Sequence, residues 1–143
     1  MKKVLSLLLT IAFLSVMLVA CKGNPAVGTY TLKTIKGMTP FDWIKDSMDA
    51  TDEGVESLLE LFDVKKNDLN EKFFILTLKE DGKASVYSEY SVLYKGTAEF
   101  EGEWSLDGDK LTVTVDGDAE IMTFKNGTLT CDFDGDEGVF EKG

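Results

Sequence analysis

Several carboxylates have a spacing that could support chemistry, and the segment 132–138 is the first candidate. It reads DFDGDEG, and Asp132, Asp134 and Asp136 alternate along it as at the start of an EF-hand calcium loop. Such a loop requires glycine at its sixth position and glutamate at its twelfth, where this sequence has a glutamate and a glycine. The segment is therefore interpreted as a solvated hairpin turn, and no metal site is predicted there.

A second group of carboxylates lies at alternate positions, at Glu99, Glu101 and Glu103. A pair of carboxylates can carry out glycoside hydrolysis. Alternation with Phe100 and Trp104, however, is typical of the solvent-facing side of a half-buried strand, where charges also block edge-to-edge pairing. The sequence thus favours a structural role for these glutamates, and we do not expect an enzyme.

The composition excludes several classes of function. The 143 residues include 15 lysines, 26 acidic residues and no arginine or histidine, which gives a net charge of −11. Nucleic-acid binding is not expected, because an acidic surface repels phosphate. Without arginine there is no bidentate clamp for a carboxylate ligand, and without histidine there is no imidazole base or imidazole metal ligand. No metal and no other cofactor is predicted.

The chain has two cysteines, Cys21 and Cys131, which could form a disulfide in an exported protein. Residues 1–20 read MKKVLSLLLTIAFLSVMLVA, in which two lysines precede an uncharged apolar run that ends in a small residue. This order is typical of a secretory signal peptide, and a transmembrane anchor is the alternative.

The four residues that end at Cys21, LVAC, resemble the lipobox of bacterial lipoproteins. The resemblance implies cleavage before Cys21 and a diacylglyceryl group on its sulfur, which would leave Cys131 without a disulfide partner. Two acyl chains give stable membrane anchoring, since each buried methylene contributes about 0.8 kcal/mol. We therefore expect a signal peptide at 1–20, a lipidated tether at 21–27 and one domain at 28–143, anchored by lipid in the cell envelope outside the cytoplasm.

Alternating apolar residues and short turns predict eight strands. The predicted strands are 27–35, 73–78, 84–88, 96–106, 110–115, 119–125, 128–133 and 139–142. Between the first two strands, residues 39–50 and 51–62 predict two short amphipathic helices, with Thr39 and either Thr51 or Asp52 as N-caps. The expected fold is mainly β, an eight-stranded antiparallel up-and-down barrel, because closure removes both exposed sheet edges.

This order of elements resembles the lipocalin-like lipoproteins of bacteria, within the calycin group. The likeness rests on VGTYTL at 27–32 and GEWSLDGDKLTVT at 102–114, and it implies an eight-stranded barrel that binds an apolar small molecule. True lipocalins stack a C-terminal arginine over a tryptophan of the first strand. This chain has no arginine, and Tyr30 stands in the tryptophan position, so the ligand chemistry of lipocalins does not carry over.

An eight-stranded barrel either holds one small ligand or fills its interior with side chains. Strand alternation places the candidate ligand-binding residues on the inward face. They are Tyr30, Leu32, Phe74, Leu76, Phe100, Gly102, Trp104 and Phe133. Gly102 is expected to open space between Phe100 and Trp104, Tyr30 to offer a hydrogen bond, and Cys131 to be a buried structural thiol.

The apolar stripe Val55, Leu58, Leu59 and Phe62 predicts a helix that covers one mouth of the barrel as a lid. Because there is no arginine to clamp a carboxylate, a neutral apolar ligand is favoured over a fatty acid. The alternative is an interaction module of the cell envelope, with a filled barrel and an acidic surface that binds another protein. A cavity of several hundred Å³ favours the first reading, and a filled interior with an exposed apolar patch favours the second.

Overall fold

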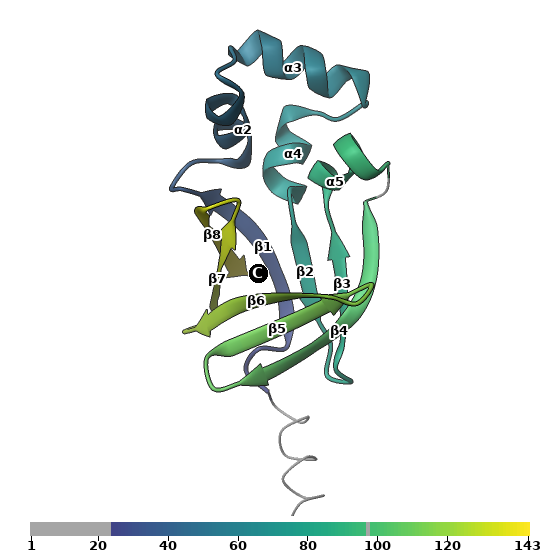
Figure 1. Cartoon of the computed structure of the whole chain (residues 1–143), viewed down its shortest axis with the longest axis vertical. Helices are drawn as coiled ribbons and strands as arrows, with labels where there is room; N and C mark the ends of the chain where they lie inside the picture. Colours follow the sequence, from purple (N-terminus) through teal and green to yellow (C-terminus); the bar gives the residue numbers. More distant parts are fainter. Residues whose placement is uncertain (1–23, 97) are drawn as a thin grey trace, which may run out of the picture.

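Eight antiparallel strands close into a barrel in which each strand pairs with its neighbours in sequence and β1 pairs with β8 (Figure 1). The computed structural model describes residues 24–96 and 98–143. The strands are β1 (Gly28–Ile35), β2 (Ile75–Leu78), β3 (Lys83–Tyr87), β4 (Glu99–Asp107), β5 (Lys110–Val115), β6 (Asp118–Lys125), β7 (Thr128–Phe133) and β8 (Asp136–Lys142). The predicted eight-stranded up-and-down barrel is confirmed, whereas the predicted signal peptide and Cys21 lie outside the described residues.

Three hairpins turn on dipeptides that the sequence alone identifies. The pairs Asp116-Gly117, Asn126-Gly127 and Asp134-Gly135 have positive φ at both residues. Such a pair forms the type I′ turn, whose twist matches that of the flanking strands. The segment with the calcium-loop spacing is thus a hairpin turn between β7 and β8, in which the carboxylate of Asp132 accepts a hydrogen bond from the backbone N–H of Gly135 at 2.7 Å.

Four helices lie at one end of the barrel (Figure 1). Three of them, α2 (Pro40–Met48), α3 (Asp52–Leu61) and α4 (Lys66–Lys72), connect β1 to β2, and α5 (Glu89–Lys95) connects β3 to β4. The N-caps of the two predicted helices are confirmed. The Thr39 and Thr51 hydroxyls accept hydrogen bonds from the backbone N–H groups of Asp42 and Gly54, at 3.3 and 3.2 Å.

The other two helices, α4 and α5, are not among the elements that the sequence predicts. Leu69 is the one fully buried residue of α4, and a single apolar side chain produces no periodic stripe. In α5, the Ser88 hydroxyl caps the helix and also donates to the backbone oxygen of Phe73 at 2.7 Å. Helices this short are held by tertiary contacts rather than by propensity, and α4 contacts both β1 and α5.

The first strand and the last strand close the barrel around a buried tyrosine. Tyr30 is fully buried, its hydroxyl donates to the backbone oxygen of Ala26 at 2.7 Å, and its ring packs edge-on against Phe124. The ammonium of Lys142 lies 5.8 Å from the centre of the Tyr30 ring.

Of the two predicted helices, α2 contacts the barrel and α3 does not pack on it to a comparable extent. α2 packs against β1 and α4, and its buried Trp43 donates from Nε1 to the Asp136 carboxylate of β8 at 2.8 Å. α3 packs chiefly on α2, so the prediction that its apolar stripe covers the barrel mouth is wrong. Val55 and Leu59 of this stripe are buried between helices, and Phe62 is 41% exposed. Within the described residues, no helix has the length and apolar character needed to cross a bilayer.

Candidate functional site

The barrel wall is incompletely paired between β6 and β7. Only residues 123–125 of β6 pair with β7. Residues 118–122 of β6 pair with β5 alone, and residues 131–133 of β7 pair with β8 alone. The β5–β6 and β7–β8 hairpins therefore separate from each other, as Figure 1 shows. The consequence is an opening in the side of the barrel.

A hollow with two lobes lies at this opening. The first lobe has a volume of about 510 Å³, and Tyr90, Asp132 and Phe133 contribute to its wall. The second lobe has a volume of about 290 Å³. Its apolar wall is formed by Phe74, Leu76, Val86, Phe100, Val113, Val115 and Phe140. Four residues line both lobes, which are thus adjoining parts of one hollow: Phe74, Glu120, Met122 and Phe140. The volumes are those of a site for a small organic molecule.

The first lobe has an aromatic wall at the helical end of the barrel. Phe74, Tyr90 and Phe133 line the lobe, and Trp43 and Phe73 pack behind them. The ring centres of Trp43 and Phe133 are 5.1 Å apart and those of Phe74 and Phe133 are 5.6 Å apart, both in edge-to-face geometry. Each such pair contributes about 0.5–1.5 kcal/mol beyond its buried area, so the wall is rigid.

One carboxylate faces the interior from the middle of β6. Glu120 pairs with Val113, which is 4% exposed, and it alternates with the outward-facing Ile121, which is 57% exposed. Glu120 therefore lies on the same face of β6 as Met122 and Phe124, and it lines both lobes. A charged side chain at an inward position is tolerated here because the open wall keeps it in contact with solvent.

Cys131 of β7 faces Glu120 across the unpaired part of the wall. It is a free thiol and is half-buried, whereas the sequence predicts a buried one. Burial raises the pKa of the thiol to about 11, and the negative charges of Glu120 and Asp132 contribute to the same increase. The thiol is thus protonated and unreactive at neutral pH, chiefly because it is buried.

Half of the eight predicted ligand-binding residues line the hollow. Phe74 lines both lobes, Leu76 and Phe100 line the second, and Phe133 lines the first. Strand alternation identifies their inward orientation correctly.

The other four predicted residues lie outside the hollow. Tyr30 and Leu32 are fully buried in the core beside β8, and the Tyr30 hydroxyl is already bonded to the Ala26 carbonyl. Trp104 lies beside the β2–β3 turn, where its indole N–H donates to the backbone oxygen of Lys79 at 2.8 Å. These three side chains hold the barrel together.

Gly102 does not open the space that the sequence suggests. A Cβ atom at this position would lie 2.1 Å from the backbone oxygen of Thr114 and 2.9 Å from a methyl group of Val115. Glycine is required here because β5 approaches β4 too closely for any side chain, which is the strand-bend role of glycine. The expected gap between Phe100 and Trp104 is therefore a prediction that the structure contradicts.

Sequence reasoning also missed residues of the hollow, chiefly Tyr90, Glu120 and Met122. The signal for two of them was present, because alternation back from the buried Phe124 puts Met122 and Glu120 on the inward face. Tyr90 lies in α5, a helix that the sequence does not predict. In residues 24–96 and 98–143, no group of three or more His, Cys, Asp or Glu side chains is arranged to hold a metal ion.

Comparison with known proteins adds no functional assignment. No family model and no curated protein matches the sequence. Among solved structures, an uncharacterized protein from Bacteroides eggerthii DSM 20697 is similar, with 12% identity, a TM-score of 0.43, and coverage of 82% of this chain and 99% of that one. A DUF4847 family protein from Bacteroides vulgatus ATCC 8482 is also similar, with 15% identity, a TM-score of 0.45, and coverage of 82% and 94%.

Proposed function

We propose that the protein is a lipid-anchored, extracytoplasmic, lipocalin-like protein that binds a small apolar molecule in the hollow between β6 and β7. The observation that carries this proposal is the hollow itself, which combines volumes of about 510 and 290 Å³ with walls of apolar and aromatic side chains. A barrel that served only as a structural module would be expected to fill this space with side chains. The side opening offers a route of entry that does not require movement of the helices.

Lipid attachment at Cys21 is compatible with access to this hollow. The described chain starts at the barrel end opposite the helices, where Lys142 donates to the backbone oxygen of Pro25 at 3.0 Å (Figure 1). Cys21 precedes Asn24 by three residues, which span at most about 10 Å. A membrane-bound acyl group would hold that end of the barrel at the bilayer surface and leave the helical end pointing away from it.

The binding proposal is tested with the mature chain carrying Cys21→Ser, so that no acyl group competes for the hollow. We expect the neutral fluorescent probe N-phenyl-1-naphthylamine to bind saturably. Met122→Trp would fill the junction of the two lobes and abolish that binding, because Met122 lines both. The matched control is Ala119→Trp, on the exposed face of the same strand, which should bind the probe normally. A folded wild-type protein that takes up no probe, or equal binding by both variants, would refute the proposal.

The anchoring proposal is tested in cells of the natural host. The wild-type protein should partition into the membrane fraction with the mass of two or more acyl chains, and Cys21→Ser should lose both properties. If the variant keeps its mass and its membrane association, residues 18–21 do not act as a lipobox.

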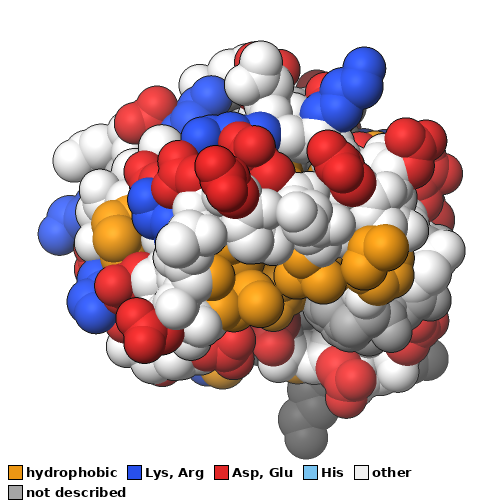
Figure 2. Space-filling view, turned by 90° about the horizontal axis from the view of Figure 1, so that it is seen from above, with side chains coloured by type: hydrophobic (Ala, Val, Ile, Leu, Met, Phe, Trp, Pro, Cys, Tyr) orange, Lys and Arg blue, Asp and Glu red, His pale blue; other side chains and the backbone are white. Residues whose placement is uncertain are grey.

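A second candidate function, binding of another envelope protein, is favoured by the apolar residues exposed on the helices. Met48, Leu61 and Phe62 are 53%, 80% and 41% exposed, and Figure 2, viewed from the helical end, shows hydrophobic side chains in a band between charged ones. Site-specific photo-crosslinking from position 61 in cells, compared with position 101 on the outer face of the barrel, tests it. Equal labelling at both positions would count against a partner at the helical end.

A further inference from the structure

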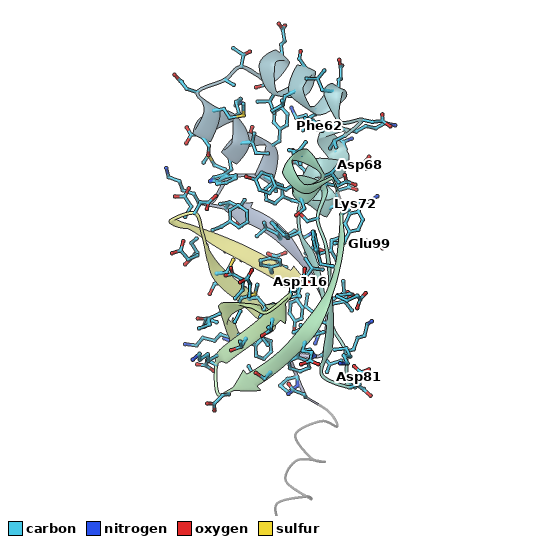
Figure 3. The ribbon with its side chains drawn as sticks, turned by 45° about the vertical axis from the view of Figure 1, so that its right-hand side comes forward. Phe62, Asp68, Lys72, Asp81, Glu99 and Asp116 are labelled. Carbon is cyan, nitrogen blue, oxygen red and sulfur yellow. The ribbon has the colours of Figure 1, made fainter. Side chains whose placement is uncertain are left out.

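Carboxylates surround the opening of the hollow. Besides the inward-facing Glu120, Asp132 and Asp134 line the first lobe, and Asp116 and Asp118 line the second. Asp116 lies at the β5–β6 turn, between the helical end and the far end of the barrel (Figure 3). These groups come from two hairpins that separate at the open wall, so that they face the same space from opposite sides.

No lysine lines either lobe, among the residues that the structure describes. The salt bridges of the described part of the chain lie elsewhere. They join Lys45, Lys66 and Lys72 to acidic residues of the helices, and Lys83 to Glu103 on the outside of β3 and β4. The carboxylates of the hollow take part in none of these ion pairs. Within the part of the chain that the structure describes, no ion pair compensates the negative charge at the opening.

The wall of the second lobe is mainly apolar, and the wall of the first lobe includes three aromatic side chains. Phe74, Tyr90 and Phe133 lie within reach of the same space as Glu120 and Asp132. Aromatic faces attract cations, and a carboxylate beside an apolar wall interacts with a cation more strongly than it does in bulk water. Burial is the main cause of the raised pKa of the neighbouring Cys131 thiol, and Glu120 and Asp132 contribute to it in the same direction.

From this arrangement we infer that the hollow selects a cationic amphiphile, a molecule with an apolar chain or ring system and a positively charged amine or quaternary ammonium group. This inference rests on the proposed function and specifies its ligand. The apolar part would occupy the second lobe against Phe100 and Val113, and the cation would lie between Glu120 and the aromatic wall of the first lobe. An anionic amphiphile of the same length would be repelled by the carboxylates.

The test uses three ligands whose alkyl chains are of nearly equal length, about nine or ten carbons, and whose head groups differ: decyltrimethylammonium, 1-decanol and decanoate. Each is titrated below its critical micelle concentration against the mature chain with Cys21→Ser, and affinity is measured by displacement of N-phenyl-1-naphthylamine. We expect decyltrimethylammonium to bind about tenfold more tightly than 1-decanol, because one favourable contact with a charged group changes the affinity by about that factor. Decanoate should bind most weakly. The preference should shrink in 0.3 M NaCl, because the site is open to solvent.

Glu120→Gln removes the central carboxylate while keeping the size of the side chain, and it should lower the preference for the cation over the alcohol about tenfold. The control is Glu101→Gln, which removes the same charge from the exposed outer face of β4 and should leave the preference unchanged. Circular dichroism checks that both variants fold.

The possible outcomes separate the two proposals. If the three ligands bind with equal affinity, or the two variants behave alike, the cationic selectivity is refuted while binding of an apolar molecule stands. Tightest binding by decanoate would likewise refute the cationic inference alone. If neither the probe nor any of the three ligands binds the folded protein, the proposed function fails and the inference fails with it.

Discussion

Replacing Gly102 with alanine tests whether the curvature of the barrel beside the hollow depends on close contact between β4 and β5. The new Cβ would lie 2.1 Å from the backbone oxygen of Thr114, so the strands would have to separate by about 1.3 Å to reach an ordinary 3.4 Å contact. Because the obstacle is backbone, rotation of a side chain cannot relieve it. The free energy of unfolding should fall by about 3 kcal/mol, at the upper end of the usual cost of overpacking.

The control for this substitution is Gly108→Ala, at the β4–β5 turn. A Cβ at Gly108 would meet nothing within 4 Å, but the φ of +61° disfavours a side chain, so the expected cost is about 1 kcal/mol. Urea unfolding followed by circular dichroism measures both values. In thermal unfolding, Gly102→Ala should lower the melting temperature by about 12 °C, at roughly 4 °C per kcal/mol for a domain of this size. A Gly102→Ala protein as stable as Gly108→Ala would show that β4 and β5 do not need the close approach.

Three further predictions concern single side chains. Tyr30→Phe should lower the free energy of unfolding by about 1–2 kcal/mol, since it leaves the buried Ala26 carbonyl without its 2.7 Å hydrogen bond. Its affinity for the probe should not change, and a large loss of affinity would show that Tyr30 belongs to the binding site. Trp43→Phe should cost roughly 2 kcal/mol in urea unfolding, because the indole N–H no longer donates to the Asp136 carboxylate; an unchanged midpoint would contradict this. Alkylation of Cys131 by iodoacetamide in the folded protein should stay slow at pH 8 and rise towards the thiol pKa of about 11. Since an unfolded thiol ionises near pH 8.5, this group should also make stability fall between about pH 9 and pH 11, and rapid alkylation at pH 8 would refute the raised pKa.

Much of the fold follows from local features of the sequence. Period-two alternation identifies all eight strands, and the inward face of β4 is predicted correctly, with Glu99, Glu101 and Glu103 on the exposed side. The Asp-Gly and Asn-Gly turns and the threonine N-caps are also confirmed, because their geometry depends on two to four neighbouring residues. The helix α4 is not predictable in this way, since Leu69 is its one fully buried residue and the helix is held by tertiary contacts.

The candidate site, too, is predicted from the sequence only in part. By itself the sequence determines which side chains point inward, and Phe74, Leu76, Phe100 and Phe133 are found by that rule. Only the tertiary structure decides that residues 118–122 of β6 do not pair with β7, because strand pairing joins segments whose register is set by closure of the whole barrel. Because of that separation, inward-facing residues become the walls of a hollow, and Glu120 lies at its opening. The close approach of β5 to β4 likewise explains why residue 102 must be glycine, which the sequence suggests only as a source of empty space.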